Sequence, residues 1–345
     1  MSVIDLRSDT VTHPTPEMRE AMAQADVGDD VYGEDPTVNR LEALAAQKMG
    51  MQGGLFVASG TMGNLIAVLA HCERGDEVIM GNLGHTFLFE GGGISALGGI
   101  FANTQINQPN GTLLLEDIRS AIRADDIHHP ISRLVILENT HNRCGGVVLS
   151  EKYTRDVADL AHERGMKVHL DGARIFNAAA ALNVPASRLT APVDSVTFCL
   201  SKGLCAPVGS VLCGSKEFIQ KARRLRKMLG GGMRQAGILA AAGIIAIQKM
   251  TDRLVEDHAR AKWLAEGLAR LPGIVFEMGM PQTNMVFPSL APDFPLTATD
   301  MANRLQKWGV RLGVVAPRRF RLVTHYWIDD VAVARTIEAF KANLI

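Results

Sequence analysis

The sequence predicts an α/β protein whose large domain is a mainly parallel sheet wrapped by helices, followed by a smaller α+β domain. From about residue 54 to 230, short apolar runs alternate with amphipathic stretches, which is typical of strands joined by crossover helices. The length of 345 residues exceeds what one hydrophobic core usually serves. Beyond Pro272 the pattern changes to shorter elements, so we place a second domain there.

Six apolar runs of the large domain have the length of strands. They are Gly54 to Ala58, Glu77 to Met80, Arg133 to Glu138, Lys167 to Leu170, Ser195 to Leu200 and Gly209 to Cys213. Between them, Met62 to Cys72 and Glu151 to Arg164 carry apolar residues at helical spacing. Strands that alternate with helices in this way predict parallel pairing.

A long helical region from Gln235 to Ala269, interrupted near Thr251, leads into the second domain. Its predicted strands are Ile274 to Glu277, Asn284 to Phe287 and Arg319 to Thr324, and its predicted helices are Ala298 to Trp308 and Asp329 to Asn343. We therefore divide the chain into an N-terminal segment (1–15), a large domain (16–250) and a small domain (251–345).

Composition excludes several classes of partner. The 36 basic residues balance 36 acidic ones, so no overall field attracts nucleic acid or an anionic membrane. No apolar stretch has the length of a transmembrane helix, and the N-terminus is charged too early for a signal peptide. Five cysteines, an odd number in mostly apolar surroundings, indicate reduced thiols. We expect a cytoplasmic protein that acts on a small molecule and binds no metal.

Two residues predict the chemistry. Asp171 ends one apolar run, and Lys202 ends the next. Pyridoxal phosphate needs a lysine to hold its aldehyde as a Schiff base and an acid that faces the pyridine nitrogen and keeps the ring protonated. Both residues follow predicted strands, and ligands of parallel sheets bind at the carboxyl ends of strands.

Each of these residues also has a structural interpretation. Ser59-Gly60-Thr61 could hold a phosphate at a helix N-terminus or form a simple turn and N-cap. Asp171 could cap a helix, and Lys202 could be a solvated loop lysine. The ordered set of small-residue loop, acid and lysine favours the cofactor site over these alternatives.

Two histidines are candidates for acid–base chemistry because imidazole titrates near neutrality. His85 follows a predicted strand, where its ring could stack on a flat cofactor. His128 lies in a polar stretch beside His129. For each of them, a simple surface role is equally compatible with the sequence.

Several motifs together resemble the low-specificity L-threonine aldolases, which are fold-type-I pyridoxal phosphate enzymes. The resemblance spans nearly the whole chain. Its motifs are Asp5 to Thr12, Val27 to Gly33, Glu138 to Asn142, Asp171 to Arg174, Leu200 to Leu204, Gly230 to Gln235 and Arg321 to His325. It implies a seven-stranded sheet in the large domain and an N-terminal segment that contributes to the active site.

The resemblance also implies roles for individual residues. Lys202 would form the Schiff base, Asp171 would hold the pyridine nitrogen and His85 would stack on the ring. Further cofactor contacts would come from Gly60, Thr61, Arg174, Ser201 and, across a subunit interface, Arg234. The substrate carboxylate would be held by Ser8, Arg174 and Arg321, since a guanidinium binds a carboxylate at two points. Tyr32 would line the site from a partner chain, and His128 would lie near the substrate hydroxyl.

The implied activity is cleavage of threonine, allo-threonine and other β-hydroxy-α-amino acids to glycine and an aldehyde, by a homo-oligomer, as a tetramer built from two dimers. The proton acceptor stays open among His85, His128 and a water molecule. An aminotransferase or a β-eliminating lyase could use the same lysine and acid. A non-catalytic binding protein of the same fold is a further alternative, and an NAD-linked enzyme is disfavoured because no good glycine fingerprint is present.

Overall fold

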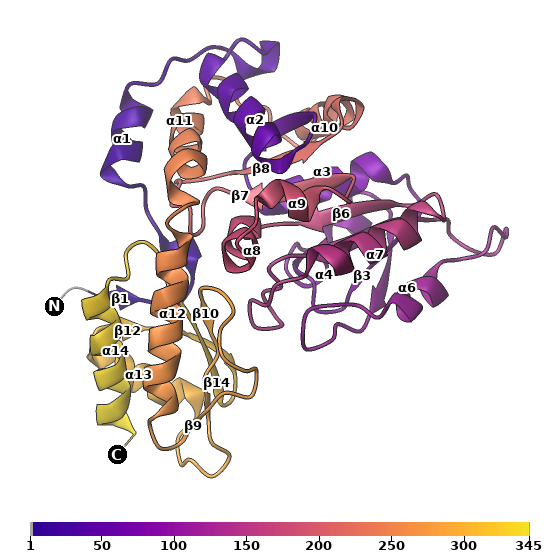
Figure 1. The fold of residues 1–345 in the computed structure, drawn as a ribbon. Coiled ribbons are helices and arrows are strands. Elements are labelled where there is room, and N and C mark those ends of the chain that lie inside the picture. Colours follow the sequence, from indigo (N-terminus) through magenta and orange to yellow (C-terminus); the bar gives the residue numbers. More distant parts are fainter. Residues whose placement is uncertain (1–2, 345) are drawn as a thin grey trace.

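The computed structural model describes residues 3–344. Figure 1 shows a large α/β part and a smaller C-terminal part, with the long helix α12 (Leu254–Ala269) running beside the small sheet. The N- and C-termini both lie at the small part. Within residues 3–344, no helix is both long and apolar enough to cross a bilayer.

The large part is built on a seven-stranded sheet with the order β2-β8-β7-β6-β5-β3-β4. The strands are β2 (Gly53–Val57), β3 (Glu77–Gly81), β4 (Phe101–Gln105), β5 (Ser132–Glu138), β6 (Lys167–Asp171), β7 (Ser195–Cys199) and β8 (Ser210–Gly214). All neighbours pair in parallel except β8, which runs antiparallel to β2 and β7. The predicted mainly parallel, seven-stranded α/β architecture is therefore confirmed.

Both faces of this sheet are covered by helices, so its strands are apolar on both sides. Alternation along β2 illustrates this, because Phe56 joins the core on one face while Leu55 and Val57 join the core on the other. The helices of the large part are α1 (Pro16–Ala23), α2 (Pro36–Met49), α3 (Gly60–His71), α4 (His85–Leu88), α5 (Gly93–Ala96), α6 (Leu115–Ala121), α7 (Glu151–His162), α8 (Ile175–Leu182), α9 (Ala186–Thr190), α10 (Lys216–Met228) and α11 (Gly237–Ile245).

Side-chain caps fix where the main helices begin. Asp35, Ser59, Ser150 and Ser215 each accept a backbone N–H in the first turn of α2, α3, α7 and α10, respectively. These caps satisfy N–H groups that have no partner within the helix. Since α3 follows β2 directly, its capped N-terminus is held next to the sheet.

The small part is an antiparallel sheet covered by α12, α13 (Ala298–Lys307) and α14 (Asp330–Asn343). Its strands are β9 (Ile274–Val275), β10 (Met285–Val286), β11 (Ser289–Leu290), β13 (Gly313–Ala316) and β14 (Arg319–Val323). The core of the large part extends to Leu254, and the core of the small part takes up α12 from Ala261. We therefore propose a domain boundary near residue 250, where the π-helical segment η3 (Ala246–Met250) ends.

The N-terminal segment links the two parts. Its strand β1 (Ile4–Asp5) pairs in parallel with β12 (Val310–Arg311), and the 3-10 helix η1 (Asp9–Val11) follows. A second 3-10 helix, η2 (Asp30–Tyr32), precedes α2. The segment thus runs from the small part toward the large one.

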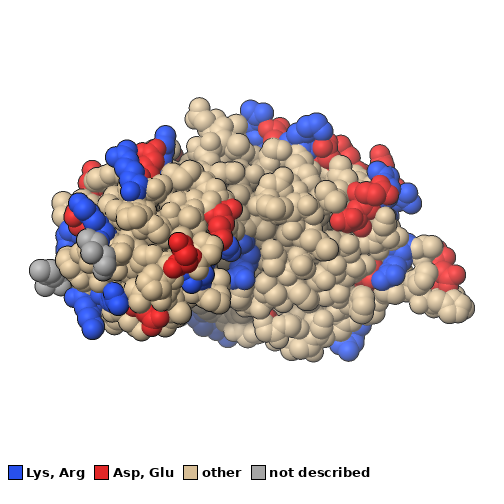
Figure 2. All heavy atoms as spheres, turned by 90° about the horizontal axis from the view of Figure 1, so that it is seen from below, with Lys and Arg blue, Asp and Glu red and all other residues tan. Residues whose placement is uncertain are grey.

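The six predicted strands of the large domain occur within one residue of their predicted ends, and β4 was missed. This strand lies at the sheet edge and its sequence, Phe-Ala-Asn-Thr-Gln, is half polar and only partly buried, so it has no continuous apolar run. On the face shown in Figure 2, basic and acidic side chains lie interspersed, consistent with their equal numbers of 36 each.

Candidate active site

The candidate site lies where β5, β6 and β7 end, at the carboxyl edge of the sheet. Asp171 is the last residue of β6, and the strand register sets it beside Glu138 of β5 and Thr197 of β7. Lys202 follows β7 after a short turn. The two residues that the sequence singled out for a cofactor therefore reach the same edge, where ligands of parallel sheets bind.

Asp171 is held by hydrogen bonds to both of its oxygens. The side-chain amide of Asn64, on α3, donates to Oδ2 at 2.9 Å, and the backbone N–H of Ala173 donates to Oδ1 at 3.1 Å. The residue is only 3% exposed. Its carboxylate is thus fixed in direction before any ligand binds.

His85 and Glu90 form a pair beside Asp171. Nδ1 of His85 lies 2.8 Å from Oε1 of Glu90, and the backbone N–H of His85 donates to Glu138 at 2.7 Å. The hydrogen bond to Glu90 raises the pKa of His85 against the effect of burial; the charge of Asp171 adds to the rise and that of Lys202 opposes it. Burial raises the pKa of Glu90. Ligand atoms of His85, Glu90 and Asp171 lie within 4.8 Å of one another, so this cluster suits a cationic group.

Arg174 forms a buried ion pair with Asp9. The residue lies just before α8, and its Nε donates to Asp9 at 2.7 Å while Nη2 donates to the other carboxylate oxygen. The side chains are 7% and 0% exposed. Burial alone would raise the pKa of Asp9, but the charge and hydrogen bonds of Arg174 hold it well below its usual range. A two-point contact of this kind fixes the guanidinium plane.

Arg321, on β14, approaches the same region from the small domain. Its Nη1 donates to Asn142 at 3.0 Å and its Nη2 donates to the backbone carbonyl of Arg7 at 3.2 Å. Its Nε is buried and has no acceptor among residues 3–344. Burial lowers its pKa, and the charge of Arg174 lowers it further. Two arginines with coupled charges therefore face a common region that would attract an anion.

The turn that carries Lys202 is tied to the N-terminal segment. The hydroxyl of Thr12 donates to the carbonyl of Lys202 at 2.9 Å, and the backbone N–H of Cys205 donates to the same carbonyl at 2.8 Å. Ser201 lies half-buried in this turn. Ser8 precedes η1 and its hydroxyl accepts the N–H of Thr10 at 3.3 Å. Ser8 thus lies next to Asp9, the partner of Arg174.

The loop Ser59-Gly60-Thr61 forms the first turn of α3. The hydroxyl of Ser59 caps the helix by accepting the N–H of Met62 at 3.2 Å, which is the structural role that the sequence left open for it. A Cβ at Gly60 would lie 3.0 Å from Sγ of Cys199, so this turn packs directly on β7. The N–H groups of Gly60 and Thr61 point out of the helix end, where an anion is favoured.

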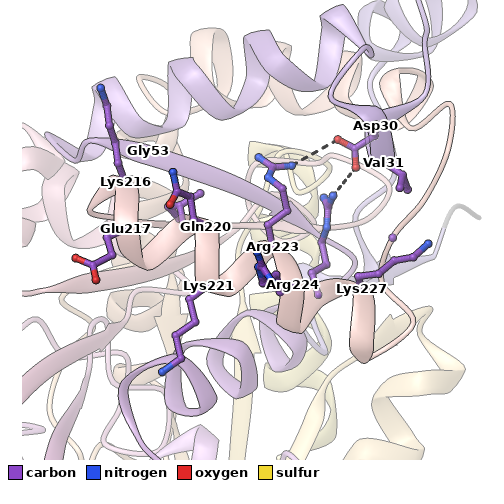
Figure 3. Close-up of a pocket in the computed structure, with 13 residues that line it drawn as sticks. Asp30, Val31, Gly53, Lys216, Glu217, Gln220, Lys221, Arg223, Arg224 and Lys227 are labelled. Atoms are coloured by element: carbon purple, nitrogen blue, oxygen red, sulfur yellow. Dashed lines mark hydrogen bonds and ion pairs between the residues drawn. The ribbon is translucent and has the colours of Figure 1, made fainter.

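Two residues matched to a cross-subunit role lie together on an exposed face. Arg234 pairs with Asp29 at 2.8 Å and is 53% exposed, and Tyr32 is 76% exposed. A surface pocket of about 860 Å³ lies nearby along α10, lined by Asp30, Arg223, Arg226 and other residues (Figure 3). This pocket does not include Asp171 or Lys202.

His128 is not brought to the site within this chain. It lies in the loop before β5, is paired with Asp126 at 2.7 Å, and its side chain is 80% exposed. It lines a surface pocket with Gly75, Phe101 and Arg123, which lie near the starts of β3, β4 and β5. That is the edge of the sheet opposite Asp171. Within one chain, His128 therefore does not reach the region of His85 and Asp171, where the substrate hydroxyl would lie.

Three site residues were missed from the sequence: Asp9, Asn64 and Glu90. Asp9 lies in the motif that contains Ser8. Its buried ion pair is with Arg174, which is 165 residues away in the sequence, so only the fold reveals it. Asn64 is a polar residue within the mostly apolar helix α3, one turn after Gly60, which is a signal that the sequence does contain. Glu90 lies in a loop five residues after His85 and carries no periodic signal.

Comparison with known proteins gives a consistent picture. The family described as Beta-eliminating lyase matches residues 5–291. A probable low-specificity L-threonine aldolase 2 of Arabidopsis thaliana is 48% identical over 341 residues, covering 98% of this chain and 96% of the plant protein. The low specificity L-threonine aldolase of Escherichia coli strain K12 is 44% identical over 342 residues, with 99% of each chain covered.

Solved structures agree in fold. A threonine aldolase of Leishmania major has a TM-score of 0.84 at 23% identity, covering 99% of this chain and 100% of that one. A putative L-allo-threonine aldolase of Listeria monocytogenes has a TM-score of 0.81 at 22% identity, covering 99% and 96%. The match to the sequence family and the full-length relatives at 48% and 44% identity together mean that this chain belongs to the low-specificity L-threonine aldolase family, whose members are pyridoxal phosphate-dependent lyases.

Proposed function

We propose that this protein binds pyridoxal 5′-phosphate and reversibly cleaves L-threonine, L-allo-threonine and other β-hydroxy-α-amino acids to glycine and an aldehyde. The observation that carries the proposal is the convergence of a lysine, an oriented acid and two arginines at the carboxyl edge of the sheet. Lysine and acid match the aldehyde and ring nitrogen of the cofactor. The arginines match the carboxylate of an amino acid.

The residues present fit the cofactor in three places. Lys202 offers an amine for the aldehyde, and Asp171 offers a fixed acceptor for a protonated ring nitrogen. The first turn of α3 offers N–H groups for the phosphate, and next to it the buried hydroxyl of Ser210 has no partner among residues 3–344. A Cβ at Gly60 would lie 3.6 Å from this hydroxyl. When bound, the cofactor supplies a conjugated, protonated ring that accepts the electron pair left on Cα when the Cα–Cβ bond breaks.

The substrate carboxylate would lie between Arg174 and Arg321, beside Ser8. Arg174 is preoriented by Asp9, and Arg321 has one buried N–H still without an acceptor among residues 3–344. Such a grip fixes the amino acid by two points, its amine and its carboxylate. Since both points are held, rotation about the N–Cα bond is restricted, and the Cα–Cβ bond can be set across the plane of the cofactor ring.

Cleavage requires removal of the β-hydroxyl proton. We assign this task to Nε2 of His85, because its Nδ1 donates to Glu90 and Nε2 is then the free acceptor. As the O–H bond breaks, its electrons form the aldehyde C=O and the Cα–Cβ pair remains on Cα. Protonation of Cα then gives glycine. His128 could act only from another subunit of the assembly.

We also propose that the protein is an oligomer with shared sites, as a tetramer of two dimers. Support comes from Tyr32 and Arg234, whose segments are joined by the hydrogen bond from the N–H of Asp30 to the carbonyl of Arg234 at 3.1 Å; the two side chains are 76% and 53% exposed. Tyr and Arg are favoured at protein interfaces. From this face Arg234 would reach the phosphate region of a partner, and active monomers in light scattering would contradict the shared site.

The test is acetaldehyde release from L-threonine and L-allo-threonine by the purified protein and by Lys202→Ala. A matched control is Lys152→Ala, which removes an exposed lysine, 84% exposed, from α7. We expect the Lys202 variant to lose turnover and the cofactor's colour while the control keeps both. A wild-type protein that binds the cofactor but converts threonine to 2-oxobutyrate by β-elimination, or transfers its amino group, would contradict the proposal.

A further inference from the structure

Behind Asp171, a row of hydrogen-bonded side chains runs through the interior of the large domain. It connects Asn64 of α3 with His169 of β6, Ser195 of β7 and His71 at the end of α3. Asn64, His169 and Ser195 are at most 2% exposed. None of these side chains would touch the substrate, and apart from the bond of Asn64 to Asp171 the roles proposed above do not use them.

The chemistry of the groups fixes the direction of each bond. Asn64 Nδ2 lies 2.9 Å from Asp171 and 2.8 Å from Glu90, and since carboxylate oxygens accept, this amide nitrogen donates to both. Asn64 Oδ1 must then accept from Nε2 of His169, at 3.1 Å. His169 therefore donates to Asn64, and Asn64 donates to Asp171.

The second nitrogen of His169 completes the row. With Nε2 protonated, Nδ1 of the neutral ring accepts from the hydroxyl of Ser195 at 2.8 Å. The hydroxyl in turn lies 2.8 Å from Nε2 of His71, which donates to it. Burial lowers the pKa of His169 to about 4 and that of His71 to about 3, so both rings stay neutral near pH 7. The hydroxyl of Ser195 thus matches the tautomer of His169 that Asn64 requires.

We propose that His169, acting through Asn64, is a positioning residue that holds the Asp171 carboxylate oriented toward the pyridine nitrogen of the cofactor. This inference rests on the proposed function, because it needs pyridoxal phosphate at this edge. Hydrogen bonds to a carboxylate are stronger than bonds between neutral groups, so donors lined up toward Asp171 hold its oxygens in place.

Asn64 links His169 to the two carboxyl groups of the candidate site. One amide nitrogen bridges two carboxyl groups, Asp171 facing the ring nitrogen and Glu90 facing His85. If His169 were unable to donate, Asn64 Oδ1 would be buried without a partner, and the amide could relieve that cost by rotating. Rotation would turn an oxygen toward Asp171 and oppose its charge. His169 therefore acts on the acid without touching it.

A purely structural role would have a different consequence. Many buried polar side chains serve only to satisfy one another, and their loss destabilises the protein without favouring any feature of a ligand. The proposed role is specific to the ring nitrogen. An analogue of pyridoxal phosphate in which C–H replaces that nitrogen gives Asp171 nothing to pair with, so it separates the two roles.

The experiment measures the affinity of apoprotein for pyridoxal phosphate and for this analogue, by absorbance titration, in three variants. His169→Leu keeps the approximate size and removes both hydrogen bonds, and His169→Gln retains an N–H at the ε position. His258→Leu is the matched control, because His258 is another histidine whose pKa burial lowers to about 4 and whose hydrogen bond to Asn177 lies outside the row.

We expect His169→Leu to weaken pyridoxal phosphate binding about tenfold and analogue binding less than twofold. His169→Gln should restore most of the loss, and His258→Leu should leave both affinities unchanged. Equal weakening for both ligands, or none for either, would overturn the inference. If His169→Leu does not fold by circular dichroism, Asn64→Ser is measured in the same way and carries the same expectation.

The results that would refute the proposed function differ from those that would refute this inference. A wild-type protein that releases no acetaldehyde from threonine would overturn the activity, whereas the selective loss with pyridoxal phosphate would still support the inference about Asp171. A wild-type protein that binds both coenzymes equally well would overturn the inference even with full aldolase activity.

Discussion

Replacing Asp9 by Asn would test how the candidate site is held together. The substitution keeps the size of the side chain and removes its charge, which leaves Arg174 buried without its counter-ion. Two unit charges about 4 Å apart at an effective dielectric constant of about 20 interact by about 4 kcal/mol. Removal of one partner from a buried pair costs about 3 to 5 kcal/mol in general. The side chains here are 0% and 7% exposed, so we expect a loss in this range.

The measurement is urea unfolding of the apoprotein at one fixed protein concentration, so that cofactor and assembly contribute equally. Asp5→Asn is the matched control, because Asp5 is in the same segment and pairs with Arg7, whose side chain is 50% exposed. An exposed pair contributes at most about 1 kcal/mol. A loss for Asp9→Asn no larger than that of Asp5→Asn would refute the reasoning.

The free energy of unfolding of Asp9→Asn should also differ from that of the wild type in its dependence on pH. The pKa of Asp9 is lowered in the folded protein, so its contribution to stability is complete above the unfolded-state value of about 3.9 and is lost as the pH falls below it. Wild-type protein should therefore lose stability on acidification more steeply than Asp9→Asn. Parallel curves for the two proteins between about pH 5 and pH 2 would contradict the lowered pKa.

Three further predictions concern the site and its support. Glu90→Gln should lower the pKa of His85, because the hydrogen bond to Glu90 is the main factor that raises it. The acid limb of the plot of kcat/KM against pH should then move to lower pH. An acid limb at the same pH as in the wild type would exclude His85 as the base. Arg321→Lys should raise KM for threonine about tenfold or more with a smaller change in kcat, since a lysine lacks the planar fork, and unchanged kinetics would remove the carboxylate contact. Gly63→Ala should lower the unfolding midpoint, because a Cβ there would lie 2.6 Å from the Cγ2 of Thr197, whereas an unchanged midpoint would mean that α3 can move away from the sheet.

Much of the fold could be predicted because its strands are buried on both faces. Runs such as Val-Ile-Met in β3 are apolar without interruption, and this signal depends little on context. β4 lacks it, because an edge strand has only one neighbour and tolerates Asn103 and Thr104. The strands β1 and β12 have two residues each and exist because they pair with each other, which no local pattern reveals.

The site could be predicted only in part. Asp171 and Lys202 were found because strand ends are visible in the sequence and their chemistry is distinctive. Asp9 and Glu90 were not, because their importance comes from partners 165 and 5 residues away, respectively, that the fold brings close. His128 shows the opposite limit: a histidine can match a motif and still lie at the far edge of the sheet in its own chain.

The bond from Arg321 to the carbonyl of Arg7 joins residues 314 positions apart. During translation, Arg7 is therefore made long before Arg321, whose side chain donates to its carbonyl. The lysine, the acid, the first turn of α3 and the strand β8, which joins β2 to β7, all precede residue 215, whereas the carboxylate site also needs β14. Within one chain, the part of the site that would hold the amino-acid carboxylate is therefore completed last, when β14 docks against the N-terminal segment.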